Sequence, residues 1–130
     1  MQTYTSYDVH SLLEKQGFTV GGVNRLISEA KTNNQQIQIV PGKWIIWIKE
    51  IKAFAVPVYW VSPVESKCEF CGTPIKNKFY DARIKTNTVN GAIAGIACPT
   101  CFTLDGCGLG TGKGQEYSKQ KDGRWLKIGG

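Results

Sequence analysis

Cys68-Glu69-Phe70-Cys71 and Cys98-Pro99-Thr100-Cys101 decide the fold of the second half of this chain. Together they read C-x2-C-x26-C-x2-C. Two C-x2-C turns can complete a tetrahedral set of four thiolates at about 2.3 Å from one ion, as in a structural zinc site. Gly72 supplies the positive φ that such a turn uses, and Pro99 stiffens the second pair. The spacing therefore predicts a structural Zn²⁺ held by Cys68, Cys71, Cys98 and Cys101.

Five cysteines occur, all between residues 68 and 107. An odd number argues against a disulfide scaffold, and the second C-x2-C pair argues against a lone redox motif. The fifth, Cys107, is either a buried thiol or a substitute for Cys101 as a ligand. Because four thiolates leave no coordination position open, the pattern predicts a metal that stabilises the fold and does not catalyse a reaction.

The segment between the cysteine pairs predicts two strands, over residues 78–85 and 92–97. Asn90-Gly91 between them favours a tight hairpin turn. Beyond Cys101 the chain is first glycine-rich and then basic and polar. The expected fold of residues 67–130 is therefore a four-cysteine zinc ribbon with a β-hairpin, followed by a glycine-rich basic tail.

The first 66 residues predict a helix pair followed by strands. Ser6 is the expected cap of a helix that ends at residue 15 or 16, before Gly17. A second helix is expected from Gly21-Gly22 to about residue 31, on the evidence of an apolar stripe at helical spacing. Strands are expected over residues 36–40, 43–48 and 53–61. The chain as a whole is thus predicted to be α+β, with a helix pair and a small antiparallel sheet before the zinc-ribbon module.

Composition excludes several classes of protein. The 130 residues (14.4 kDa) are 42% hydrophobic and 20% charged, which excludes a disordered chain. No apolar run approaches the roughly twenty residues of a membrane-spanning helix, and the first residues lack the basic start of a secretory signal. We expect no membrane association and a reducing cytosol.

The net charge of +6 is uneven along the chain. Residues 1–67 hold seven basic and five acidic side chains (+2), and residues 68–130 hold nine and five (+4). A basic second half favours contact with nucleic acid or an acidic surface, and the alternative is that the charge serves solubility alone. Under the first interpretation the contact residues are Arg83, Lys113, Lys119, Lys121 and Arg124.

Glycine occupies every second position from Gly106 to Gly114. A P-loop needs Gly five positions before its Gly-Lys pair and Ser or Thr after it, but this chain has Cys107 and Gly114 there. The dinucleotide pattern G-x-G-x-x-G fails as well. The segment is therefore either a packed loop that needs glycine for positive φ, or a place where a phosphate backbone or a protein strand approaches closely.

No enzymatic site is predicted, because paired carboxylates and a nucleophile–base pair are lacking. His10, the only histidine, falls in the first predicted helix. The helix pair also suggests a helix-turn-helix, but Gly21-Gly22 weakens its second helix, so a pair that covers the sheet is favoured. Aromatic side chains in the strands offer a protein interface, or stacking surfaces for bases: Trp44, Trp47, Tyr59 and Trp60.

From Cys68 to about Ile128 the sequence resembles small zinc-ribbon proteins encoded by tailed bacteriophages. The resemblance is carried by both cysteine pairs, Phe102 and residues 79–83, 108–117 and 123–127. It implies a phage origin and a zinc held by four cysteines. It also implies a location in the cytoplasm of the bacterial host, with the virion as the alternative location. That family has no settled activity to carry over. From the basic second half and the lack of a catalytic constellation, we expect a non-enzymatic binding module for nucleic acid or a nucleic-acid machine. The alternative is a protein-interaction part, either a virion component or an inhibitor of a host defence enzyme.

Overall fold

The computed structural model describes residues 1–62, 64, 66–87, 89 and 91–130. The chain forms two compact units, Met1–Pro57 and Val58–Gly130. The described residues contain three helices and two antiparallel sheets, so the predicted α+β class is confirmed. In the same part of the chain, no helix is both long enough and apolar enough to cross a membrane.

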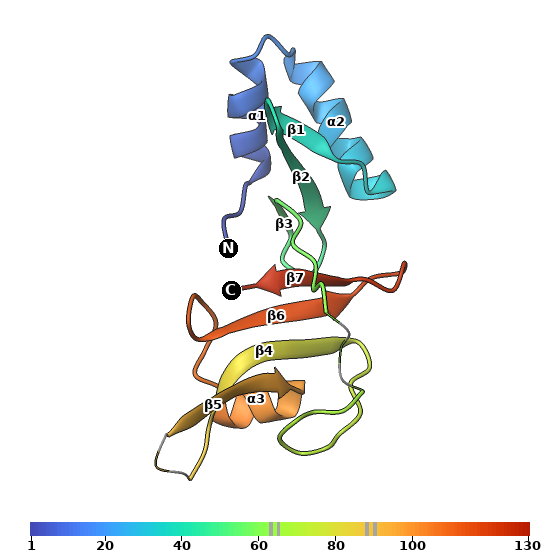
Figure 1. Cartoon of the computed structure of the whole chain (residues 1–130). Coiled ribbons are helices and arrows are strands. Elements are labelled where there is room, and N and C mark those ends of the chain that lie inside the picture. The colour runs from blue at the N-terminus through green and yellow to red at the C-terminus, as the bar shows by residue number, and fades with distance from the viewer. Residues whose placement is uncertain (63, 65, 88, 90) are drawn as a thin grey trace. The chain divides into compact units, whose positions relative to one another are not determined.

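The first unit is a helix pair followed by a three-stranded sheet (Figure 1). The expected hairpin is present, with Gly42 at a φ of 79° in its turn. The strands lie in the order β1-β2-β3, all antiparallel. In chain order the elements are α1 (Ser6–Glu14), α2 (Val20–Asn33), β1 (Ile37–Val40), β2 (Lys43–Ile48) and β3 (Ala53–Ala55).

Threonines cap both helices of this unit, which corrects the expected cap at Ser6. The Thr5 side chain accepts the Asp8 N–H and the Asp8 carboxylate accepts the Thr5 N–H, so the helix begins at Ser6 behind a capping box. Thr19 accepts the Gly22 N–H, and this cap lets α2 begin before its glycine pair. A threonine cap thus offsets the low helix propensity of that pair.

The helix pair packs on the sheet and forms the core of the first unit. Its apolar stripe is confirmed, because Val23, Ile27 and Ala30 are buried. The other buried members of this core come from α1, the strands and the N-terminal segment: Tyr4, Val9, Leu13, Ile37, Ile39, Ile45 and Phe54.

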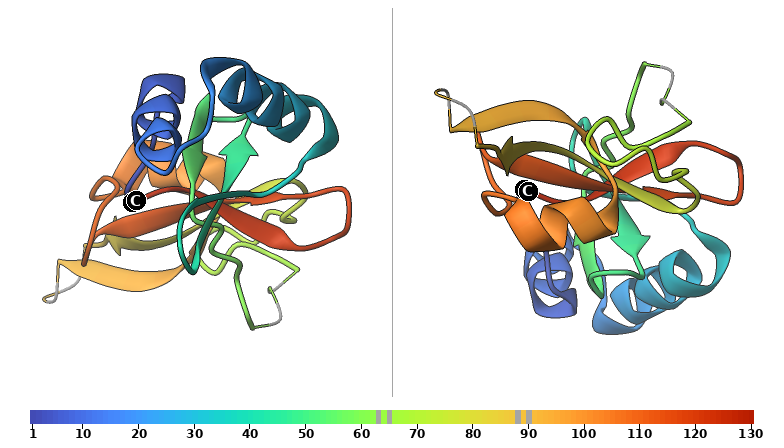
Figure 2. Two further views of the ribbon diagram at one scale, coloured as in Figure 1. Left: turned by 90° about the horizontal axis from the view of Figure 1, so that it is seen from above. Right: turned by 90° about the horizontal axis from the view of Figure 1, so that it is seen from below.

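The second unit is a four-stranded antiparallel sheet in the order β5-β4-β6-β7, with a helix against one face (Figures 1 and 2). β4 (Lys78–Lys85) and β5 (Ala92–Ala97) have the expected bounds and pair in regular register from Tyr80↔Ala97 to Lys85↔Ala92. The turn predicted at Asn90 lies outside the described residues.

The expected glycine-rich basic tail is wrong, because this segment completes the sheet. The chain forms α3 (Pro99–Asp105), β6 (Gly114–Lys119) and β7 (Trp125–Gly129). β6 lies between β4 and β7, although only Gly114 and Tyr117 of its residues are buried. Pairing on both edges, which the polar sequence of β6 does not signal, holds it in the sheet.

The strand expected over residues 53–61 ends at Ala55, and the residues after it belong to the second unit. The Trp60 N–H donates to the Trp125 carbonyl (2.9 Å), and the Lys127 N–H donates to the Val58 carbonyl (2.7 Å). The unit boundary therefore falls after Pro57 and not after residue 66.

Both faces of the second sheet are partly buried. On one face Phe79 and Tyr117 stack with ring centroids 5.0 Å apart, and Trp60 and Trp125 meet Phe79 edge-on. On the other face Ala82, Ile84 and Ala97 pack with Phe102 and Cys101 of α3. The cysteine segments thus belong to the core on the α3 face.

Candidate metal centre and basic surfaces

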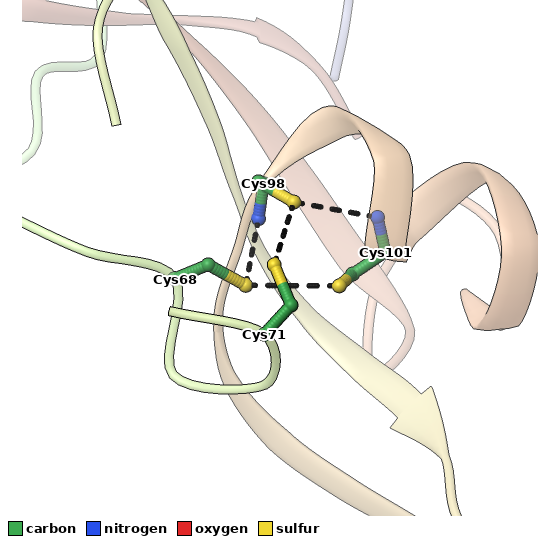
Figure 3. Close-up of side chains that lie close together, drawn as sticks. All are labelled: Cys68, Cys71, Cys98 and Cys101. Atoms are coloured by element: carbon green, nitrogen blue, oxygen red, sulfur yellow. Dashed lines mark hydrogen bonds between the residues drawn. The ribbon is translucent and has the colours of Figure 1, made fainter. Parts of the chain in front are cut away.

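The four predicted ligands come together from two segments of the second unit (Figure 3). Cys68 and Cys71 lie in the loop before β4, and Cys98 and Cys101 lie at the start of α3, directly after β5. Their sulfur atoms all lie within 4.8 Å of one another. These four residues could hold a metal ion.

The sulfur spacing fits a tetrahedral ion. In a tetrahedron with metal–sulfur bonds of about 2.3 Å, neighbouring sulfurs are about 3.8 Å apart. Here the Sγ atoms of Cys68 and Cys101 are 3.8 Å apart, and those of Cys71 and Cys98 are 3.6 Å apart. A disulfide would need about 2.05 Å, and all five cysteines are free thiols.

Backbone turns place these sulfurs. The Gly72 N–H donates to the Cys68 carbonyl (3.0 Å), and Gly72 has a φ of 77°, which an L side chain rarely adopts. Cys98 is the N-cap of α3, with Pro99 in the first turn, and its sulfur accepts the Cys101 N–H (3.4 Å). Helix initiation therefore sets the position of the second pair.

Backbone N–H groups are aimed at one buried sulfur. The Cys68 Sγ accepts N–H groups of Phe70 (3.4 Å) and Cys98 (3.3 Å). Burial raises the pKa of Cys68, but these donors and the Cys71 N–H outweigh it, so the pKa lies below its ordinary value. The Cys68 thiolate is thus stabilised before any cation arrives.

Cys71 and Cys101 differ in their readiness to ionise. The hydroxyl and then the backbone N–H of Thr73 lower the pKa of Cys71 to about 6. Burial, followed by the nearby sulfurs of Cys71, Cys98 and Cys68, raises the pKa of Cys101. Four sulfurs this close cannot all carry charge unless a cation compensates them, so the donor set fits a thiolate-binding metal ion.

The first cysteine turn is fastened to β5 by Glu69. The Glu69 N–H donates to the Ile96 carbonyl (3.0 Å), and the Ile96 N–H donates to the Glu69 carboxylate (2.8 Å). A Cβ on Gly95 would overlap Glu69 Oε2 and lie 3.1 Å from the Phe70 ring, so a larger residue there would displace the Glu69 carboxylate from the Ile96 N–H. This role of Glu69 was not predicted, because a carboxylate between two cysteines is not a specific sequence signal.

Cys107 lies outside the four-cysteine group. Its N–H donates to the Arg83 carbonyl (3.2 Å), beside β4, and its side chain is half-buried. Of the two alternatives, substitution for Cys101 is disfavoured, because Cys101 itself lies among the other three sulfurs.

The five predicted contact residues are all exposed, but they fall into two groups. Lys119, Lys121 and Arg124 form the turn group, where β6 passes into β7. Arg83 and Lys113 form the sheet-end pair, in which the Arg83 N–H donates to the Lys113 carbonyl (2.9 Å). Lys113 and Lys119 are six positions apart along extended chain, a distance of roughly 20 Å. The five residues therefore do not make one continuous patch.

Aromatic rings accompany the turn group. The Arg124 guanidinium lies 4.0 Å from the centre of the Tyr59 ring, and the Lys119 ammonium lies 5.9 Å from that of Trp125. Arg124 also pairs with Asp122, with its Nε 2.7 Å from Oδ2. Two of the three side chains of the turn group therefore lie over half-buried aromatic rings.

The other aromatic candidates have separate surroundings. Trp44 is 46% exposed on β2, while Trp47 packs against the core of the first unit beneath the Lys31 ammonium. Trp60 packs against the Phe79 core of the second unit. Of the four residues expected at a protein interface, Trp44 is the most exposed.

Comparison with known proteins finds no matching family model, no matching curated protein and no matching solved structure. The resemblance of residues 68–128 to phage zinc-ribbon proteins thus has only the motifs quoted above as its support.

Proposed function

We propose that this chain is a non-enzymatic, zinc-stabilised module that binds single-stranded nucleic acid through the turn group. The observation that carries the proposal is the set of three exposed basic side chains at the β6–β7 turn, two of which, Lys119 and Arg124, lie over the rings of Trp125 and Tyr59. Cationic groups contact phosphates, and aromatic or guanidinium planes stack with bases. Following the resemblance to phage proteins, we propose the cytoplasm of an infected bacterium as the location of this activity.

Zinc is the proposed metal because its preferred geometry matches the donor set. Four thiolates at tetrahedral spacing are typical of structural zinc. Bound there, Zn²⁺ would join the loop before β4 to the start of α3 and so stabilise the sheet that carries the turn group.

The same donor set favours a binding module over an enzyme. A site closed by four sulfurs has no position for a substrate or an activated water. His10, the only histidine, has its Nε2 2.8 Å from Asn24 Oδ1 and its Nδ1 3.5 Å from Glu14, which suits a structural role between α1 and α2.

The test is binding of a fluorescently labelled thymidine oligonucleotide, about twenty nucleotides long, to the metal-loaded chain. With three phosphate contacts, log Kd should change with log salt with a slope near 2, about 0.7 for each contact. Lys119→Gln/Lys121→Gln/Arg124→Gln should weaken binding at low salt roughly tenfold or more and flatten this slope.

Lys15→Gln/Lys49→Gln/Lys52→Gln is the matched control, because it removes three exposed charges from the first unit. It should leave binding nearly unchanged. Equal weakening by both triple variants would attribute binding to net charge and reject the turn group. Absence of binding at low ionic strength would reject the proposed function.

A further inference from the structure

β5 is an edge strand of the second sheet (Figure 1). Glu69 bonds to one end of its outer side, at Ile96. Both main-chain groups of Ile96 bond to Glu69 and therefore point away from β4. The β4–β5 register is regular and main-chain directions alternate along a strand, so Ala92 and Ala94 also direct N–H and C=O outward. Across the described parts of the chain, nothing bonds to these four outward groups.

The side chains near this free edge are small on β5 itself and basic on the neighbouring strand, β4. Ala94 pairs with Arg83 and Ala92 pairs with Lys85, so these four side chains share one face of the sheet. Alanine does not cover the cationic groups behind it, and both basic side chains are exposed. Two positive charges can therefore be reached from the edge of β5.

A hollow lies behind Ala94 on the same face. Its volume is about 230 Å³, and Arg83, Lys113 and Gln115 line it together with Asp81 and the glycines that flank Lys113. This hollow is large enough to admit a carboxylate side chain that passes over Ala94 toward Arg83.

The opposite face of the edge is apolar. Ile93 lies between the two alanines, pairs with the buried Ile84 and is 45% exposed. Successive side chains of a strand added to β5 would therefore lie alternately on the face of Arg83 and Lys85 and on the face of Ile93.

We propose that the free edge of β5 binds an extended acidic strand with an acidic–apolar–acidic pattern. An added strand would lie about 4.8 Å from β5 and roughly 10 Å from β4, within reach of an extended glutamate and Arg83. Bonds to the main chain of Ala92 and Ala94 supply affinity, while Arg83 and Lys85 select the acidic residues. A second copy of β5 is a poorer occupant, since β5 has no acidic side chain.

Fluorescence anisotropy of the metal-loaded chain with a labelled hexapeptide of alternating Glu and Val tests the charge selection. This peptide should bind at least tenfold more tightly than one of alternating Lys and Val. Arg83→Gln/Lys85→Gln should abolish the preference, and Lys119→Gln/Lys121→Gln, which removes as many charges from the turn group, should not. Equal binding of the two peptides would overturn the proposal.

The main-chain bonds are tested separately. N-methylation of every second amide of the Glu/Val peptide, in each of the two registers, should weaken binding roughly tenfold in the register that faces β5. Ala94→Pro should have the same effect, because it removes an outward N–H without touching the bonds to β4. Undiminished binding by both methylated peptides would overturn the proposal, whether or not Ala94→Pro folds.

Two other occupants would show themselves in the same experiments. Concentration-dependent dimerisation that Ala94→Pro abolishes would identify a second copy as the occupant and overturn the acidic strand. Displacement of the peptide by the thymidine oligonucleotide, with Arg83 and Lys85 required, would assign this edge to nucleic acid. The turn group lies at the other end of β6, so the result of its oligonucleotide test does not depend on the result of the peptide test.

Discussion

At the scale of single residues, the four thiols of the candidate centre differ from one another in their exposure to solvent. Cys68 and Cys98 are 3% and 4% exposed, whereas Cys71 lies at the surface. A substitution at either buried position would damage packing as well as ligation. A substitution at Cys71 removes a ligand and disturbs little else, which makes it the informative position.

Cys71→Ser should therefore lower the bound metal from one equivalent per chain to a small fraction, because serine replaces a soft thiolate with a weakly coordinating hydroxyl. Elemental analysis of protein purified without chelator measures this. Cys107→Ser is the control and should retain a full equivalent, since Cys107 lies outside the group. Full retention of metal by Cys71→Ser, or its loss from Cys107→Ser, would reject the assigned ligand set.

The alternating glycines are required for two different reasons. Gly108, Gly110 and Gly112 have positive φ values of 94°, 133° and 75°, as expected of a packed irregular loop. Gly114 lacks positive φ, and a Cβ there would lie 2.9 Å from both the Ala82 Cβ and the Gly108 carbonyl. The sequence shows the alternation of glycine but not its causes, because one depends on the backbone φ angle and the other on close packing against the neighbouring strand.

At the scale of elements, the sequence predicted those whose signals are local. The α2 stripe, the Pro41-Gly42 hairpin and the bounds of β4 and β5 follow from side-chain period and turn chemistry. β6 was not predicted because pairing on both edges, and not apolar content, holds it in the sheet. β7 was not predicted either, although its apolar residues alternate and Leu126 and Ile128 are buried. α3 has a local signal, Pro99 directly after the capping Cys98, but the same residues also fit a C-x2-C turn.

The candidate centre was predicted better than the surfaces around it. The spacing of the cysteines was enough to predict one group, because a C-x2-C turn imposes its own geometry. The group consists of Cys68, Cys71, Cys98 and Cys101. The division of the basic residues could not be predicted, because it depends on β6 separating Lys113 from Lys119. The free edge of β5 depends in the same way on strand order.

α1 offers a test of a single element. It has nine residues, and its first turn is held by the capping box of Thr5 and Asp8. Thr5→Ala should destabilise the first unit by about 1 kcal/mol. For a unit of this size, this corresponds to a midpoint lower by about 4–8 °C in thermal unfolding followed by circular dichroism.

Thr3→Ala, two residues earlier, is the matched control for this change and should leave the midpoint unchanged. Thr3 is exposed and precedes the helix. An unchanged midpoint in Thr5→Ala would mean that packing of Val9 and Leu13 alone determines the stability of α1.

On the scale of the whole molecule, we expect the two units to depend on the candidate metal to different degrees. The first has one continuous core of ten buried residues and no cysteine. The second divides its core between two faces of a sheet into clusters of three buried residues each, and one of these clusters packs against Cys101. A small core of this kind gains a large share of its stability from a metal.

Chelation should therefore unfold the second unit and leave the first unit folded. Without a cation, the crowded sulfurs either repel as thiolates or take up protons, and the contact between the loop before β4 and α3 weakens. Amide NMR spectra recorded before and after a strong chelator is added should lose the dispersed signals of residues 58–130, keep those of residues 1–57 and recover when Zn²⁺ is restored. Retention of both sets of signals would contradict the metal dependence of the second unit. Loss of both would show that the two units unfold as one cooperative body and would contradict their expected independence.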